Sequence, residues 1–322
     1  MTDPVRFDEY QQRCLYDPDG GFYSTGGGAG RRGDFITSPE VGPLFGAVIA
    51  RAIDTWWEAS GRPKFFDLVE VGAGRGALTA AILDAGTGCG TALRPVCVEQ
   101  SAALRLAASE LLGDRAEVRA DLPDGTVHGL IVANELLDNL VVRVVERTAD
   151  GWAEVWVDGS TEVLRPTELE IDLDVPPGTR LPVHERAAHW VADVLDHLGP
   201  GRLVAIDYGV RTTSELVGRP WLRTYSGHGR GVDPLQAPGA LDITVDVAFD
   251  QLPGDPTITT QRQFLIDNGI DALVEEARAV WHARSHLGDL EAIRARSRVG
   301  EADALLDPGG LGAFLVAEWI RP

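Results

Sequence analysis

The feature that most constrains the fold is a strand that runs directly into a glycine-rich turn. The apolar stretch 67–71 precedes Gly72, Gly74 and Gly76, and segment 77–85 follows them with helical periodicity. Glycines at this spacing let the backbone take unusual dihedral angles and let a ligand come close. Strand–turn–helix units of this kind often hold the phosphates of nucleotide cofactors, so the turn is predicted to bind such a cofactor.

Two carboxylates around this turn favour a cationic cofactor over a dinucleotide. Glu70 lies two residues before the first glycine, where its charge would repel a pyrophosphate. The same charge attracts the ammonium group and sulfonium of S-adenosyl-L-methionine (SAM). Glu99 follows the strand-like run 94–98, and a carboxylate at that strand tip can accept both ribose hydroxyls, as in NAD sites. The alternative is an ordinary turn with two solvated acids; the glycines and both acids together favour SAM.

The charge balance argues against one class of substrate. The 322 residues include 49 acidic and 29 basic side chains, so the formal net charge is −20. Double-stranded nucleic acid is not expected as a substrate, because phosphate contacts dominate that affinity. A basic peptide or a small cation would be steered inward, although an acidic surface also serves solubility alone.

The sequence predicts neither a membrane segment nor a metal site. No apolar run approaches the roughly 20 residues of a membrane helix, and the N-terminus is polar and acidic, so we expect a cytoplasmic protein. Cys14, Cys89 and Cys97 lack metal-ligand spacing and are expected to be reduced, mostly buried thiols. His184 and His189 are five residues apart rather than four, which places them off a single helix face and argues against a zinc protease motif.

Strand and helix patterns alternate between residues 65 and 133, which predicts an α/β fold with a parallel sheet and helices on both faces. Ligands of such sheets bind beyond the carboxyl ends of the strands. Asp121, with Leu122, would lie near an adenine, or would serve as a helix N-cap or turn residue. The other candidate residues also follow apolar runs directly: Glu70, Glu99, Gln100, Asn134, Glu135, Asp207 and Tyr208.

These stretches resemble the MidA-like family of SAM-dependent methyltransferases, which includes a mitochondrial protein-arginine methyltransferase needed to assemble respiratory complex I. The most specific match is GDFITSPEVGPLFG (33–46), because it is long and is not a generic nucleotide-binding pattern. The likeness runs through most of the chain in the family's order, at LYDPDGGFY (15–23), LVEVGAGRGAL (68–78), VANELLDNL (132–140), IDYG (206–209), APGALDITVDVAF (237–249) and TQRQFLIDNGI (260–270).

The resemblance implies a Rossmann-like class I methyltransferase core with a seven-stranded sheet, an N-terminal cap and an inserted lid or substrate region. We expect the cap over residues 1–60 and the SAM-binding core over 61–209, with a β-hairpin insertion at about 141–185. The lid and substrate region would span 210–299, and a C-terminal strand in 300–322 would complete the sheet.

The resemblance also assigns site residues. Thr37 and Ser38 of the cap segment would close over the cofactor, while Asn134 and Glu135 would face its methyl group. The SAM loop is assigned to Glu70, Gly72, Gly74 and Gly76, and the ribose contact to Glu99.

Three positions depart from the family pattern. Val141 stands where a proline is expected, Asp246 where many members have histidine, and Ala248 where a second acid is expected. All three lie in regions on the substrate side.

The chemistry of methyl transfer suggests roles for the acids. A guanidinium, with a pKa above about 12, is a poor nucleophile until a carboxylate orients and polarises it. Glu135 is predicted to be that carboxylate, and Asn134 to hold either Glu135 or the amino acid moiety of SAM. Asp138 would face the same site or stabilise a helix N-terminus. Asp207, with Tyr208, would act as a base or second guanidinium clamp, or would bond a loop.

The expected function is SAM-dependent N-methylation of an arginine guanidinium in a protein or peptide, with S-adenosyl-L-homocysteine as product. One alternative is a methyltransferase that acts on an amine or carboxylate of a small molecule or modified peptide. Another is an assembly factor that binds SAM without turnover. The sequence leaves the acceptor, the number of methyl groups added and the oligomeric state open.

Overall fold

The structure is a computed structural model that describes residues 3–24, 37–226 and 229–322. The chain divides into two compact units, and each is described by itself. The first, the sheet unit, comprises residues 29–134, 197–206 and 256–322. The second, the hairpin unit, comprises residues 1–28, 135–196 and 207–255.

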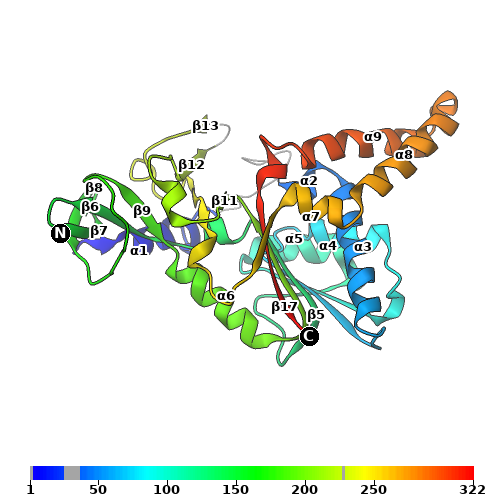
Figure 1. The fold of residues 1–322 in the computed structure, drawn as a ribbon, viewed down its shortest axis with the longest axis horizontal. Coiled ribbons are helices and arrows are strands. Elements are labelled where there is room, and N and C mark those ends of the chain that lie inside the picture. Colours follow the sequence, from blue (N-terminus) through cyan, green and yellow to red (C-terminus); the bar gives the residue numbers. More distant parts are fainter. Residues whose placement is uncertain (1–2, 25–36, 227–228) are drawn as a thin grey trace. The chain divides into compact units, whose positions relative to one another are not determined.

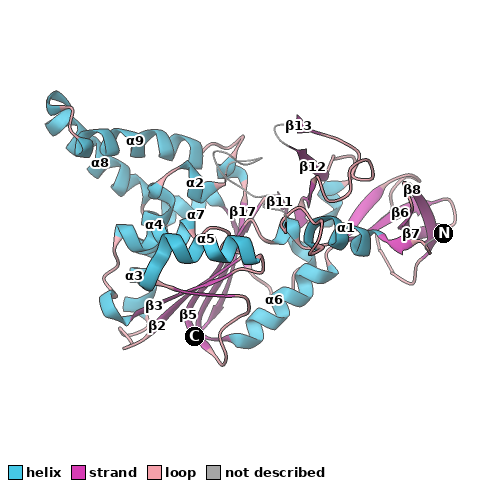
Figure 2. Ribbon diagram, turned by 180° about the vertical axis from the view of Figure 1, so that it is seen from behind, coloured by secondary structure: helices cyan, strands magenta, loops and turns pink. Residues whose placement is uncertain are grey.

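The sheet unit is built on a seven-stranded sheet, which confirms the predicted α/β class (Figures 1 and 2). The five strands β10, β5, β2, β3 and β4 run parallel, and β16 pairs with β17 antiparallel at one edge. In sheet order the strands are β16 (Thr257–Thr260), β17 (Leu315–Arg321), β10 (Leu198–Asp207), β5 (Val127–Asn134), β2 (Phe66–Val71), β3 (Leu93–Val98) and β4 (Glu117–Arg119).

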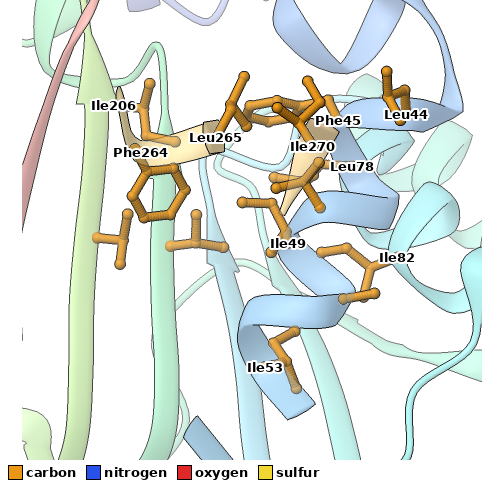
Figure 3. Close-up of a cluster of buried hydrophobic side chains, with 14 of the residues drawn as sticks. Leu44, Phe45, Ile49, Ile53, Leu78, Ile82, Ile206, Phe264, Leu265 and Ile270 are labelled. Atoms are coloured by element: carbon orange, nitrogen blue, oxygen red, sulfur yellow. The ribbon is translucent and has the colours of Figure 1, made fainter. Parts of the chain in front are cut away.

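Helices of the sheet unit supply most of its apolar core. The core joins Phe45 and Ile49 of α3, Leu78 of α4 and Phe264 of α7 (Figure 3), and each is at most 2% exposed. Burying each such side chain stabilises the fold by about 1.5–3 kcal/mol. The helices are α2 (Ser38–Val41), α3 (Pro43–Ala59), α4 (Ala77–Ala85), α5 (Ala102–Leu112), α7 (Gln261–Asp267), α8 (Ile270–Arg284) and α9 (Leu290–Leu305).

Helices α3 and α4 approach closely because of one glycine. A Cβ on Gly46 of α3 would lie 2.4 Å from the Cβ of Ala81 on α4, closer than real side chains allow. The N-terminus of α3 is held from α9, where a carboxylate oxygen of Glu301 accepts a 2.9 Å hydrogen bond from the Leu44 N–H. This carboxylate replaces the intrahelical partner that the first turn of a helix lacks.

The hairpin unit contains an antiparallel sheet and several short ladders. Strands β6 and β7 pair within the range 141–185 in which a hairpin is predicted. The sheet has the order β1 (Val5–Arg6), β7 (Gly151–Asp158), β6 (Arg143–Thr148) and β9 (Arg180–Val183), with β8 (Thr161–Pro166) on β7. The unit also holds α1 (Phe7–Tyr16), the short helix η3 (Leu137–Asn139), α6 (Glu185–His197), β11 (Gly209–Val210), β12 (Leu222–Ser226), β13 (Gly229–Arg230), β14 (Asp242–Val245) and β15 (Val247–Ala248).

The two units divide the chain differently from the predicted domains. Residues 1–28 belong to the hairpin unit, because Phe7 of α1 is buried in one apolar cluster with Val144 and Val155. Residues 256–299 belong to the sheet unit, because α7 and α8 supply side chains such as Ile270 to its core. Contacts between distant segments, rather than loop composition, therefore determine the boundaries.

Within the part of the chain that the structure describes, no helix is both long and apolar enough to cross a membrane. No three histidine, cysteine, aspartate or glutamate side chains of the described residues gather as metal ligands. Cys14, Cys89 and Cys97 are all buried and free, as the sequence predicts.

Candidate functional site

The glycine turn joins β2 to α4 in the conformation that its sequence predicts. Gly72, Gly74 and Gly76 have φ angles of 72°, 54° and 77°, in the region that favours glycine. The Gly72 N–H donates a 2.9 Å hydrogen bond to the Val98 carbonyl, which attaches the turn to the end of β3. A Cβ on Gly74 would meet no described heavy atom within 4 Å, whereas one on Gly76 would lie 2.9 Å from the side chain of Leu112. Gly74 therefore borders open space, and Gly76 packs against α5.

Glu99 lies at the tip of β3 with its carboxylate on the glycine turn. One oxygen, Oε2, accepts a 2.9 Å hydrogen bond from the Gly74 N–H, and Oε1 accepts one of 2.8 Å from the Ser101 N–H. The side chain is half-buried, and this burial raises the pKa of its carboxyl group. A carboxylate beside the space at Gly74 matches the predicted position of a ribose acceptor, and the ribose contact stays a prediction.

Glu70, at the end of β2, has a partner within the sheet unit. Its Oε2 atom accepts hydrogen bonds from Thr79 of α4, at 3.0 Å from the backbone nitrogen and 2.5 Å from the hydroxyl. The side chain is 5% exposed, and burial raises the pKa of its carboxyl group to about 7. Glu70 therefore caps the helix that follows the turn through Oε2, and its contact with the cofactor stays a prediction. Thr79, nine residues later, is the partner that the sequence interpretation missed.

The remaining predicted residues of the sheet unit differ in exposure. Because β2 to β5 are parallel, the residues that follow them lie at one edge of the sheet. Asn134 and Leu122 are half-buried there, while the side chains of Gln100 and Asp121 are exposed. No helix follows Asp121 before β5, so it is not a helix N-cap. The adenine contact of Asp121 and Leu122 stays a prediction.

Thr37 and Ser38 both have partners within the sheet unit. Thr37 is the N-cap of α2 and forms a capping box with Glu40. The Ser38 hydroxyl donates a 2.9 Å hydrogen bond to Gln261 on α7, and both side chains are completely buried. These contacts anchor the segment, whereas its closure over a cofactor stays a prediction. Residues 33–36 of the family-like stretch lie outside the described residues.

In the hairpin unit, Asp207 is bound to the backbone of the turn that follows β5. Its Oδ2 atom accepts hydrogen bonds of 2.8 Å and 3.2 Å from the N–H groups of Leu137 and Asp138. Its Oδ1 atom accepts one of 2.9 Å from the Tyr208 N–H, and the side chain has no exposed surface. Both oxygens serve the turn, so Asp207 has the predicted role of bonding a loop, and its role as a base or guanidinium clamp stays a prediction. Burial, followed by the charges of Asp138 and Glu135, raises the pKa of Asp207 well above its usual range.

Glu135 has a strained backbone at the start of that turn. Its φ angle is 54°, and among the described residues only Arg62 and Asp255 share a positive φ without being glycine. Such conformations cost about 1–3 kcal/mol and gather at functional sites. The Glu135 side chain is half-buried.

Asp138 belongs to a buried polar network and not to an exposed helix end. The side chain is 3% exposed, and burial raises the pKa of its carboxyl group to about 7. The carboxyl group and the Tyr208 side chain interact electrostatically. The Arg223 guanidinium lies 4.9 Å from the centre of the Tyr208 ring and forms a 2.5 Å ion pair with Asp246. The sequence analysis did not single out Arg223. Its ion pair with Asp246 gives a structural reason for an acid at this position, where many family members have histidine.

Two tyrosines of the N-terminal stretch LYDPDGGFY hold the same turn. The Tyr16 hydroxyl donates a 3.0 Å hydrogen bond to the carbonyl of Asn139, and the Tyr23 hydroxyl lies 2.9 Å from its side-chain oxygen. The Asn139 amide in turn donates a 3.0 Å hydrogen bond to Asp138. Tyr16 and Tyr23, which are far from the turn in sequence, thus help to hold the buried polar network around Asp138.

Comparison with known proteins identifies the family to which the sequence is similar. Residues 48–262 match the model of the Methyltransf_28 family, which describes S-adenosyl-L-methionine-dependent methyltransferases. The Mus musculus protein named "Protein arginine methyltransferase NDUFAF7, mitochondrial" is 28% identical over 360 residues, which cover 93% of this chain and 80% of the mouse protein. The Danio rerio protein of the same name is 28% identical over 330 residues, covering 85% and 75%.

A solved structure is also similar over nearly the whole chain. A COG1565 superfamily member from Burkholderia thailandensis, crystallised with S-adenosyl-homocysteine, has a TM-score of 0.85 and 29% sequence identity. The match covers 99% of this chain and 88% of that chain. The similarity therefore extends through both units of the structure.

Proposed function

This chain belongs to the Methyltransf_28 family of S-adenosyl-L-methionine-dependent methyltransferases, and from that premise we propose that it methylates an arginine guanidinium of a protein substrate. The names of the mouse and zebrafish relatives support this acceptor. The observation within this chain that carries the proposal is the strained carboxylate-bearing residue Glu135.

The residues of the glycine turn fit SAM. The left-handed backbone of the turn leaves space beside Gly74, and the Glu99 carboxylate lies next to that space. We assign the cofactor to Gly72, Gly74 and Gly76, with the ribose on Glu99 and the adenine near Asp121. When bound, SAM supplies a methyl group on a positively charged sulfur.

Glu135 is suited to orient a guanidinium. An arginine side chain is protonated at neutral pH, so its nitrogen lone pair is engaged in the delocalised cation. A carboxylate that accepts two guanidinium N–H bonds holds the group in one plane and stabilises its charge. Asp207 closes the turn that begins with Glu135, and Glu135 has a left-handed backbone there; both features support this assignment.

Methylation of a protonated guanidinium releases one proton, and we assign Asp138 to accept it. The pKa of Asp138 is raised to about 7 by burial, so this carboxyl group can exchange a proton near neutral pH. Its contact with Tyr208 links it to a second proton-carrying group. The Arg223 guanidinium over the Tyr208 ring keeps a compensating positive charge beside these acids.

The test is to incubate the purified protein with methyl-labelled SAM and a cell lysate, and then to identify labelled residues by mass spectrometry. We expect methylarginine in proteins, its loss in Glu135→Gln and its retention in Glu110→Gln, which changes an exposed glutamate of α5. Label found only in small molecules would instead support an amine or carboxylate acceptor outside proteins. A cytoplasmic location remains our prediction, and fractionation of cells that produce the protein would test it.

A further inference from the structure

The hairpin unit contains a cavity that the proposed chemistry does not use. Its volume is about 410 Å³, and its walls come from segment 169–173, strand β9, residues 213–214 and residues 250–251. We call it the β9 groove. All of its walls belong to the hairpin unit.

The segment on one wall alternates between acidic and apolar side chains. It lies between β8 and β9, which Figure 1 labels. Leu169, Ile171 and Leu173 are half-buried against the apolar cluster of the unit. The acids between and beside them are exposed: Glu168, Glu170, Asp172 and Asp174. The apolar residues thus anchor the segment, and the acids are in contact with solvent.

Of these four acids, Glu170 and Asp172 line the groove, together with the three apolar residues of the segment, whereas Glu168 and Asp174 do not. Neither Glu170 nor Asp172 forms an ion pair with a cation of the described residues. The arginine of β9, Arg180, is instead paired with Glu146 and Glu162. The groove therefore presents acidic charge that the unit itself does not compensate.

The backbone of the same segment is not paired with another strand. Residues 168–175 lie outside every strand ladder, and within the described chain they make no backbone–backbone hydrogen bond. The Ile171 carbonyl accepts a 3.2 Å bond from the Trp152 indole, and the Leu169 N–H donates to the Thr167 hydroxyl. Extended segments of this kind can accept an added strand, in which main-chain bonds give affinity and alternate side chains give specificity.

We propose that the β9 groove docks an extended basic stretch of a protein partner. Apolar side chains of the partner fill the cavity, and its arginines or lysines pair with Glu170 and Asp172. The net charge of −20 steers such a partner toward the protein. The assignment of this partner as the methyl acceptor rests on the proposed function, whereas the docking itself does not require turnover.

The experiment measures fluorescence anisotropy of a labelled nine-residue peptide of alternating arginine and valine, titrated with the whole protein at low salt. The wild type is compared with Glu170→Gln/Asp172→Asn and with Glu168→Gln/Asp174→Asn, which removes the same charge from the same segment outside the groove. We expect the groove variant to bind about tenfold more weakly, and the control variant to bind within about twofold of wild type.

Equal weakening in both variants would show that only diffuse charge attracts the peptide and would overturn the proposal. Absence of wild-type binding, or unchanged binding in the groove variant, would overturn it as well. Groove-selective binding without any methylarginine in the lysate assay would leave the docking site standing and reject the proposed acceptor. Once a methylated protein has been identified, the groove variant should have a higher KM for that protein and an unchanged kcat.

Discussion

The carboxylate of Asp207 accepts a 2.8 Å hydrogen bond from the backbone N–H of Leu137, 70 residues earlier in the chain. A second bond from the Asp138 N–H goes to the same oxygen. Together these bonds close the turn that begins with Glu135. A fully buried acid thus holds the turn that begins with the residue that we assign to the substrate.

Asp207→Asn should lower turnover more than it lowers SAM affinity. The amide keeps the shape of the side chain, but its NH₂ group would face N–H donors and leave a buried donor unpaired, at a cost of about 1–3 kcal/mol. Urea unfolding, calorimetric titration with SAM and kcat measure the three effects. Asp54→Asn is the control, because Asp54 caps the Gly88 N–H elsewhere in the fold. Normal kcat in a destabilised Asp207→Asn would limit this residue to a structural role.

Glu135→Gly should stabilise the protein by about 1 kcal/mol and abolish turnover, because glycine relieves the left-handed strain while removing the carboxylate. Glu135→Gln should keep SAM affinity and lose turnover without this gain. Asp255→Gly is the matched control, since Asp255 has a φ angle of 46° on an exposed loop. It should gain similar stability and stay active. Chemical denaturation measures the stability of each variant, and kcat measures its turnover. If Glu135→Gln is active, Glu135 has no catalytic role.

Gly74→Val should abolish SAM binding while the protein stays folded. A side chain there would enter the space beside Glu99, and the positive φ angle adds about 1–3 kcal/mol of strain. Gly90→Val imposes similar strain, at a φ angle of 52° and also in open space, but outside the glycine turn. Calorimetry should show wild-type SAM affinity for Gly90→Val and none for Gly74→Val. Equal affinity in both variants would contradict the placement of the cofactor.

Glu70→Gln should change how stability depends on pH. The pKa of Glu70 is about 7 in the folded protein, against an ordinary value of 4.5. The folded state therefore binds this proton more tightly, so the contribution of Glu70 is fully present below about pH 4.5 and is lost as the pH rises through about 7. The free energy of unfolding of Glu70→Gln, minus that of wild type, should increase between pH 4.5 and pH 8. Urea unfolding measures stability against pH for each protein. The profile of the exposed control Glu110→Gln should run parallel to that of wild type, and a parallel profile for Glu70→Gln would contradict the buried location of Glu70.

The local pattern of the sequence was enough to predict the sheet and its glycine turn. Strand and helix periodicity, together with glycines at 72, 74 and 76, are properties of neighbouring residues, and the structure has both features where they were expected. The position of Glu99 at the tip of β3 follows from the same local pattern, because the residue after a parallel strand must lie at the carboxyl edge of the sheet.

Tertiary structure alone decided which partners within the fold the acids bind. Glu70 and Glu99 look equivalent in the sequence, but Glu70 bonds to Thr79 of α4, whereas Glu99 bonds to the turn itself. The partners of Asp207 are 69 and 70 residues away, and Arg223 meets the Tyr208 ring only through folding. Burial and hydrogen bonding of a carboxylate depend on the segments that surround it in space, and local periodicity carries no information about segments so distant in the chain.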